Sequence, residues 1–436
     1  MSNLFMLLIK SEKMLRSLLF VGFMLTQLCS YAQQSIQKYS FIEKLPGYTF
    51  IGPHTFYADK QASGYDLIKD IKKGTPFYFS TKAAEGNYQI TIQVKANDGV
   101  AGSFTVKAES RRLMLLNTPL KAGQSTTKTF TVNIKDRQIT NGVAVKLKPR
   151  EFTKLDWDEK LTIEFDATHC SLQTLTITKG EEHFPTIYLA GNSTVVNQED
   201  EPWASWGQMI TAFFNPKVAI ANHAESGLSL GSFLSSKRLD KVLSVMQPND
   251  YLFIEFGHND QKEKGHNAGA YGSYTDRLRF FVKAVRAKQG IPVILTSTNR
   301  RSFDENGRIT NSLGDFPEAA RKVAAELNVP LIDLNKMTKV LYETLGVEPS
   351  KKAFVHYPAN TYPAQHEALE DNTHFNTYGA YQIAQCVLQG IREKVPSLVV
   401  YIKENAPVYN PARPGALADW NWPESPRADS TKPDGN

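Results

Sequence analysis

Cysteine is scarce in this chain, with three residues among 436. Cys29 falls within an amino-terminal leader, which leaves Cys170 and Cys386. We expect these two residues to lie in different domains, so a disulfide framework is not predicted.

Long apolar runs and basic runs are also missing. The apolar run at residues 18–25 is too short to span a membrane. No block of lysine and arginine indicates a nucleic-acid partner. The sequence has no H-E-x-x-H motif, and the spacing of His258, His266, His356 and His366 fits no common ligand pattern, so neither a metal nor another cofactor is predicted.

The first 32 residues have the composition of a secretory signal peptide. Lys10, Lys13 and Arg16 precede the apolar run, and Ser-Tyr-Ala at residues 30–32 is typical of a cleavage site. Met14 is an alternative start, and Leu28 stands where a lipid-anchoring motif before Cys29 would need a small residue. We therefore expect export to the periplasm or the extracellular space.

The net charge is mildly positive. Its formal value of +6 becomes +4 when the three basic residues and one acidic residue of the leader are removed. This balance is compatible with an anionic polysaccharide as partner. The sequence does not indicate an oligomeric state.

Residues 36–182 show the alternation of apolar and polar side chains that is typical of β-strands. Tyr88, Ile90, Ile92 and Val94 alternate with polar residues, and Gly, Asn and Asp clusters separate such runs. The pattern predicts an all-β sandwich or jelly roll as an accessory domain.

Residues 185–400 show a different period, in which short apolar strands alternate with helices. Strands are predicted at 186–191, 217–221, 251–257, 292–297 and 331–334, and helices from 203, over 232–246, 274–288 and 316–327, and from 375 to about 393. One further helix and a long loop are expected within 335–370. This alternation predicts a three-layer α/β/α domain with a parallel sheet. Residues 401–436 form a tail whose six prolines exclude regular structure, with Trp420 and Trp422 as its expected anchors.

Three stretches of this domain combine into a site for nucleophilic catalysis. Ser193 follows the strand at 186–191, Asn259 follows another strand, and Asp371 precedes His374 by three residues. Ser193 is the candidate nucleophile and His374 its base, with Asp371 fixing the tautomer of the imidazole. Asn259, Gly227 and the backbone N–H of Ser193 are the candidate oxyanion donors, and His258 is expected to support Asn259.

The stretches YLAGNSTV, NHAESGLS, FIEFGHND and DNTHFNTYGA resemble the four sequence blocks of the SGNH (GDSL-like) hydrolases, most closely the rhamnogalacturonan acetylesterases. This resemblance implies a flavodoxin-like three-layer fold and metal-free removal of acetyl groups from pectic polysaccharide. It implies Ser193, Asp371 and His374 as the triad, and Ser193, Gly227 and Asn259 as the oxyanion hole. The region before residue 182 resembles galactose-binding-like domains.

The chain departs from that family at two positions. Asn192 stands where the family usually has aspartate, which keeps the size and loses the charge, so loop geometry is expected to survive through amide hydrogen bonds with activity reduced. Leu228 stands where the acetylesterases often have arginine, which leaves contact with an acidic sugar open.

Three other interpretations remain. GLSLG at residues 227–231 also matches a G-x-S-x-G elbow, in which Ser229 would attack and Asp333 would serve the histidine. The substrate could be acetylxylan or another acetylated carbohydrate. A carbohydrate-binding protein with a weakened catalytic domain is the third.

Overall fold

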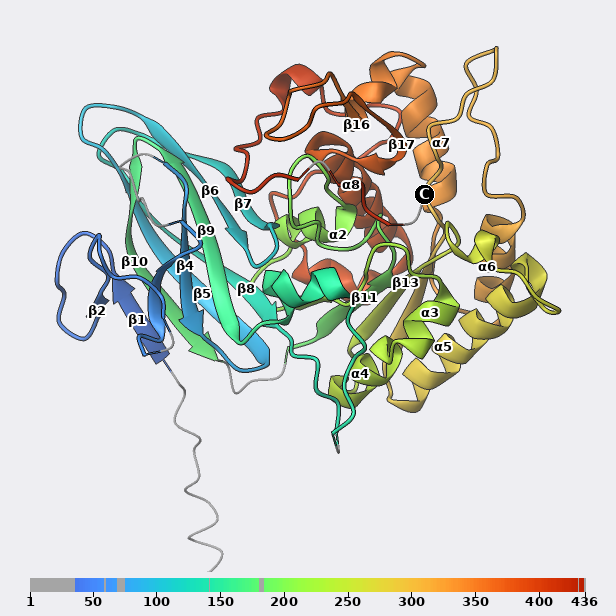
Figure 1. Ribbon diagram of the computed structural model, residues 1–436, viewed down its shortest axis with the longest axis horizontal. Helices are drawn as coiled ribbons and strands as arrows, with labels where there is room; N and C mark the ends of the chain where they lie inside the picture. Colours follow the sequence, from blue (N-terminus) through green and yellow to red (C-terminus); the bar gives the residue numbers. More distant parts are fainter. Residues whose placement is uncertain are drawn as a thin grey trace, which may run out of the picture.

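The computed structural model describes residues 36–58, 60–68, 75–140, 142–179, 184–429 and 431–434. The predicted signal peptide lies outside these residues. An all-β region and an α/β region lie side by side, and the carboxyl-terminal segment runs across both (Figure 1).

The all-β region consists of two five-stranded sheets with the orders β2-β1-β10-β5-β8 and β3-β4-β9-β6-β7. Their strands are β1 Ile36–Ser40, β2 Thr49–Phe50, β3 Ser63–Asp66, β4 Phe77–Lys82, β5 Gly86–Ala96, β6 Gly102–Ala108, β7 Arg112–Leu120, β8 Ser125–Ile134, β9 Lys160–Thr168 and β10 Cys170–Lys179. Ile90, Ile92 and Val94 of β5 share one core with Phe104 and Val106 of β6 in the other sheet. The predicted all-β domain is thus confirmed as two packed sheets.

The α/β region is built on a five-stranded parallel sheet with the order β12-β11-β13-β14-β15. Its strands are β11 Thr186–Gly191, β12 Ala219–Asn222, β13 Tyr251–Glu255, β14 Ile291–Leu295 and β15 Leu331–Ile332. In chain order this is the 2-1-3-4-5 arrangement of flavodoxin-like folds, with its switch point between β11 and β13. The predicted parallel sheet is confirmed.

Helices cover both faces of this sheet and complete three layers. They are α2 Trp206–Met209, α3 Leu230–Ser235, α4 Arg238–Val245, α5 Thr275–Ala287, α6 Phe316–Glu326, α7 Leu334–Leu345 and α8 Thr377–Lys394. Alternate residues of β11 point to opposite faces: Ile187 and Leu189 pack with α2, α7 and α8, whereas Tyr188 and Ala190 pack with α3 to α6.

Two predicted helices differ from the structure. The helix expected over 232–246 is divided into α3 and α4, because Lys237 adopts the left-handed conformation at φ 68°. The helix expected from Trp203 begins at Trp206, because Ser205 is its N-cap and the Ser205 backbone N–H donates to Gln208 Oε1 at 3.1 Å. Serine favours such a cap over a helix interior because its hydroxyl competes for backbone hydrogen bonds.

Asp371 and His374 lie on a strand that we did not predict. β17 (Leu369–Phe375) pairs antiparallel with β16 (Phe354–Tyr357) in a two-stranded sheet. The register of this pair is interrupted between Glu370 and Phe375, so DNTH lies in an irregular part of the strand whose two ends pair with β16.

The tail makes contacts with both the β-sandwich and the α/β region. Trp420 packs on Tyr381 of α8 with a ring-centroid distance of 4.8 Å, and Trp422 Nε1 donates to Glu201 Oε1 at 2.8 Å. Further along, Lys107 Nζ of β6 donates to Ser425 Oγ at 2.8 Å. Both tryptophans are therefore contacts that hold the tail on the protein.

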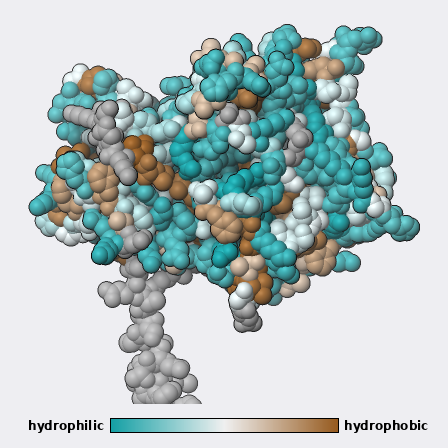
Figure 2. Space-filling view, viewed as in Figure 1, coloured by the Kyte–Doolittle hydropathy of each residue, from teal (hydrophilic) through white to brown (hydrophobic). Residues whose placement is uncertain are grey.

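The surface facing the viewer in Figure 2 is mainly hydrophilic, with hydrophobic residues in small scattered groups. Among the residues that the structure describes, no helix is both long and apolar enough to cross a bilayer.

Candidate active site

The loop after β11 holds Ser193 at the carboxyl edge of the sheet. Its turn is closed by the backbone N–H groups of Val195 and Val196, which both donate to Asn192 O at 3.0 Å. Gly191 permits the turn, because a β-carbon there would lie 2.4 Å from Val195 Cγ2. Gln198 Nε2 also donates to Ser193 O at 3.1 Å, so the serine is held by its own loop.

Ser193, His374 and Asp371 form a continuous line of hydrogen bonds. His374 Nε2 lies 2.8 Å from Ser193 Oγ, and His374 Nδ1 lies 2.7 Å from Asp371 Oδ2. All three side chains are buried, with exposures of 4%, 1% and 4%. Residues 181 positions apart are thus within direct proton-transfer distance.

Asp371 is held as an anion by its neighbours. Burial alone would raise its pKa, but the hydrogen bonds from the His374 ring and from the backbone N–H groups of His374 and Thr373 lower the pKa to about 2. Asp371 Oδ2 also lies 3.6 Å from Lys432 Nζ of the tail. A carboxylate ionised at neutral pH can orient the imidazole and stabilise its protonated form.

The other predicted donors follow the neighbouring strands. Gly227 comes after β12 with φ +79°, a conformation that favours glycine, and Asn259 comes after β13. Asn259 Nδ2 donates to Leu228 O at 3.1 Å, which ties the two loops together. Because β12, β11 and β13 are adjacent, Gly227, Ser193 and Asn259 all lie at one edge of the sheet, around the switch point.

A family model described as the GDSL-like lipase/acylhydrolase family matches residues 189–382. Rhamnogalacturonan acetylesterase RhgT of Bacillus subtilis (strain 168) is 44% identical over 209 residues, which cover 48% of this chain and 89% of RhgT. The chain belongs to the GDSL-like family. The resemblance drawn from the four sequence blocks is therefore confirmed, and so is the prediction of an ester hydrolase.

Two further relatives of this GDSL-like protein come from the same bacterium. The probable rhamnogalacturonan acetylesterase YesY is 33% identical over 210 residues, covering 48% of this chain and 92% of YesY. The uncharacterized esterase YxiM is 25% identical over 318 residues, covering 72% of this chain and 68% of YxiM.

Asn192, which departs from the usual GDSL-like aspartate, is fully buried. Its Oδ1 accepts hydrogen bonds from the backbone N–H of Thr194 at 3.1 Å and from Thr194 Oγ1 at 3.0 Å. A carboxylate would accept the same two bonds, so the amide preserves the loop as expected. Nδ2 of Asn192 has no partner among the described residues.

Glu255, at the end of β13, joins this loop to α2. Its carboxylate lies 3.0 Å from Thr194 Oγ1 and accepts a hydrogen bond from Trp206 Nε1 at 2.6 Å. Burial raises the pKa of Glu255 to about 7, although both hydrogen bonds lower it. We missed this residue, although FIEFGHND already placed a carboxylate at the end of a buried strand.

His258 does not support Asn259 in the way we expected. No hydrogen bond joins its ring to Asn259 among the described residues; Asn259 is held by Leu228 instead. Burial and the nearby charge of Arg300 lower the pKa of His258 well below its usual value, so the ring is neutral. It is a buried, uncharged ring beside Asn259 in the chain.

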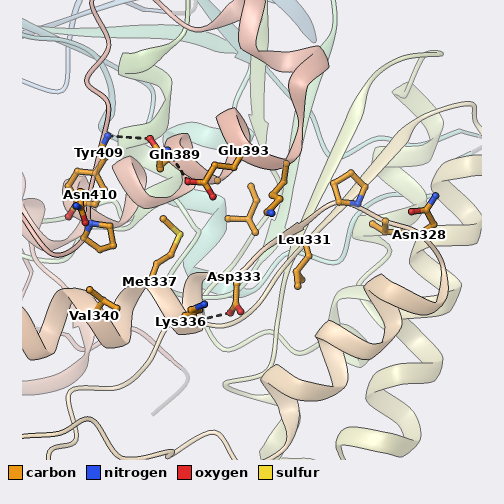
Figure 3. Close-up of a pocket in the computed structure, with 16 residues that line it drawn as sticks. Asn328, Leu331, Asp333, Lys336, Met337, Val340, Gln389, Glu393, Tyr409 and Asn410 are labelled. Atoms are coloured by element: carbon orange, nitrogen blue, oxygen red, sulfur yellow. Dashed lines mark hydrogen bonds between the residues drawn. The ribbon is translucent and has the colours of Figure 1, made fainter.

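The two residues of the alternative elbow have other partners. Ser229 is the N-cap of α3 and donates to Glu263 Oε1 at 2.6 Å. Asp333 caps α7 and accepts hydrogen bonds from Arg321 at 2.9 and 3.0 Å. It also lines a cavity of about 1080 Å³ between α7, α8 and Tyr409, and Ser193, Ser229 and His374 do not line that cavity (Figure 3). The geometry therefore favours Ser193 as the nucleophile of a GDSL-like site.

In the part of the chain that the structure describes, no group of three or more His, Cys, Asp or Glu side chains is arranged to hold a metal ion. Cys170, in β10, and Cys386, in α8, are free and lie in different regions, as expected.

Proposed function

We propose that this enzyme removes O-acetyl groups from rhamnogalacturonan in pectin. The general activity, carbohydrate acetylesterase, is supported by RhgT, named a rhamnogalacturonan acetylesterase, and YesY, named a probable one, which are 44% and 33% identical to this chain over 209 and 210 residues. The single observation that carries the chemistry is the hydrogen-bonded line from Ser193 through His374 to Asp371.

In the proposed mechanism, His374 Nε2 takes the hydroxyl proton while Ser193 Oγ attacks the acetyl carbonyl. The backbone N–H groups of Ser193 and Gly227 and the amide of Asn259 stabilise the oxyanion of the tetrahedral intermediate. The imidazolium then returns the proton to the sugar oxygen, which leaves as a hydroxyl group. Water, deprotonated by His374, attacks the acetyl-serine and releases acetate.

The experiment is acetate release from a panel of acetylated rhamnogalacturonan, acetylxylan and small acetylated sugars. We expect release to be fastest from rhamnogalacturonan, and Ser193→Ala to lower kcat by a factor of at least about 10³. Ser229→Ala is the matched control and should keep activity on every substrate. Full activity of Ser193→Ala would contradict the assignment of the nucleophile.

Binding of the polymer without release of acetate would favour the alternative of a weakened, carbohydrate-binding protein. Faster release of acetate from acetylxylan than from rhamnogalacturonan would favour acetylxylan as the substrate.

We further propose that the enzyme acts outside the cytoplasm, where such polymers occur. The composition of residues 1–32 supports this proposal. Amino-terminal sequencing of secreted protein is expected to start after Ala32.

A further inference from the structure

Three cationic side chains of one short segment lie beside the predicted oxyanion hole. The segment contains the 3₁₀ turn Pro149–Thr153, which follows the β-sandwich strand β8. Lys148 Nζ donates to Ser226 O at 2.7 Å, and Arg150 Nη2 donates to the same oxygen at 3.2 Å. Both cations therefore contact the residue that precedes Gly227.

Buried ion pairs fix this segment in place. Glu151 is paired through both of its oxygens with Arg238 Nη2 at 2.7 and 2.6 Å, and both side chains are fully buried. Buried Glu225 accepts from Arg150 Nη2 at 2.6 Å and from Lys154 Nζ at 2.8 Å. The cations are thus pre-positioned, which lowers the entropic cost of binding an anion.

A carboxylate of the chain's own tail occupies this cluster. Asp434 Oδ2 lies 2.9 Å from both Lys148 Nζ and Arg150 Nη1. A β-carbon at Gly227 would lie 2.8 Å from Asp434 Cβ, so Asp434 packs directly against the predicted oxyanion donor. Two residues earlier, Lys432 contacts Asp371 of the predicted triad.

The carboxylate that pairs with Lys148 comes from outside the segment. Lys148, Arg150 and Lys154 face one buried carboxylate, Glu225, and the second negative charge comes from Asp434. Arg150 and Lys154 also line a cavity of about 220 Å³ that Lys432 borders. Glu199 and Asp200, which also line this cavity, are paired with Arg427, and the charge of Lys154 lowers the pKa of both. No ion pair joins either carboxylate to Lys148 or Arg150 among the described residues.

We propose that Lys148 and Arg150 form a subsite for the carboxylate of a uronic acid in the substrate, and that Asp434 occupies this subsite in the free enzyme. The inference rests on the proposed function, because a pectic polymer carries such carboxylates next to its acetylated positions. The subsite would also supply a positive charge for an acidic sugar that position 228 does not supply, because Leu228 is apolar and buried. The substrate displaces the tail end from the catalytic edge as it binds.

The test is calorimetric titration of the full chain with trigalacturonate. We expect Lys148→Gln to weaken binding about tenfold, because it removes the charge but keeps an N–H donor for Ser226 O. Asp434→Asn should strengthen binding several-fold, because it removes the competing carboxylate. Lys146→Gln is the matched control on the same segment, since Lys146 is exposed, and it should bind like the unmodified protein.

Equal binding by all four proteins, or no binding by any, would overturn the subsite. Because Asp434→Asn and Lys148→Gln are expected to change affinity in opposite directions, misfolding of one variant cannot produce the expected pattern. The acetate-release panel is independent of this titration. Binding of trigalacturonate without acetate release from rhamnogalacturonan would contradict the proposed function but not the subsite. Acetate release from rhamnogalacturonan without binding of trigalacturonate would contradict the subsite alone.

Discussion

Single side chains decide the protonation states of this site. Asp371 stays ionised because N–H groups donate hydrogen bonds to it. The pKa of Glu255 is raised to about 7 because the effect of burial outweighs that of its two hydrogen bonds. Both carboxyl groups are buried at the same edge of the sheet, so their surroundings, and not their residue type, set their charge.

Asp371→Asn should lower kcat about 10⁴-fold with little change in KM. The asparagine Oδ1 can still accept from Thr373 and His374, but its Nδ2 would then face His374 Nδ1 and force the wrong tautomer. Hydrolysis of 4-nitrophenyl acetate measures the effect. Asp333→Asn, the same chemical change at the carboxylate of the alternative elbow, should stay active; loss of activity there instead would reverse the assignment.

Glu255→Gln should change how stability depends on pH. The folded-state pKa of Glu255 is about 7, above its ordinary value of 4.5, so its contribution to stability is fully present below pH 4.5 and is lost as pH rises to 7. Glutamine resembles the protonated form at every pH. We therefore expect urea unfolding to show the variant gaining stability relative to the unmodified protein by up to about 1.4 kcal/mol per pH unit over this range. A difference independent of pH would show that Glu255 does not titrate there.

At the scale of elements, the position of β17 depends on a close approach between α8 and the 3₁₀ turn before β16. A β-carbon on Gly379 would lie 1.8 Å from Ala353 O, and Asn376, the N-cap of α8, donates to Phe354 O at 3.1 Å. β17 carries Asp371 and His374 and leads directly into α8. The packing of the first turn of α8 therefore determines the position of His374.

Gly379→Ala should destabilise the protein by about 1–3 kcal/mol and lower kcat, because backbone must move to admit the methyl group. Urea unfolding and 4-nitrophenyl acetate hydrolysis measure the two effects. Gly415→Ala is the control, since its nearest neighbour, Gln382 Nε2, would be 3.4 Å away. Equal stability of the two variants would contradict the close contact.

At the scale of the whole molecule, the tail joins the β-sandwich to the catalytic layers through buried charge. Lys107 Nζ of β6, 1% exposed, donates to Glu164 Oε1 at 2.9 Å, to Pro423 O at 2.7 Å and to Ser425 Oγ. Figure 1 shows the tail passing from these strands to the edge of the parallel sheet. The β-sandwich thus holds the tail that covers the site, and the segment after β8 supplies the cations that the tail contacts.

Lys107→Met should cost about 3–5 kcal/mol of stability, because it leaves Glu164 buried without its cation. It should also release the tail, so that limited proteolysis cuts after residue 420 much faster than in the unmodified protein. Lys95→Met, which removes an accessible pair with Asp98, should change stability by less than about 1 kcal/mol. A tail that stays protected in Lys107→Met would show that its tryptophans alone retain it.

The sequence by itself determined the layers and the reacting groups. Hydrophobic periods of two and near 3.6 residues follow from which faces must be buried, so β5, β11 and α5 could be read locally. Ser193, Gly227 and Asn259 could be placed at one edge because parallel strands carry their loops at the same end. Helix boundaries such as that at Lys237 were missed, because a single left-handed residue leaves no periodic signal.

Only the tertiary structure decided what surrounds those groups. Asp371 and His374 lie in an irregular part of β17, between the residues that pair with β16, and the charge of Glu255 depends on burial that no local pattern records. Lys148, Arg150 and Asp434 come from segments 286 positions apart, and nothing in either segment indicates the other. Periodicity indicates which face of one segment is buried, whereas electrostatic partners depend on how distant segments pack. The reacting groups could therefore be predicted from the sequence, and the carboxylate subsite could not.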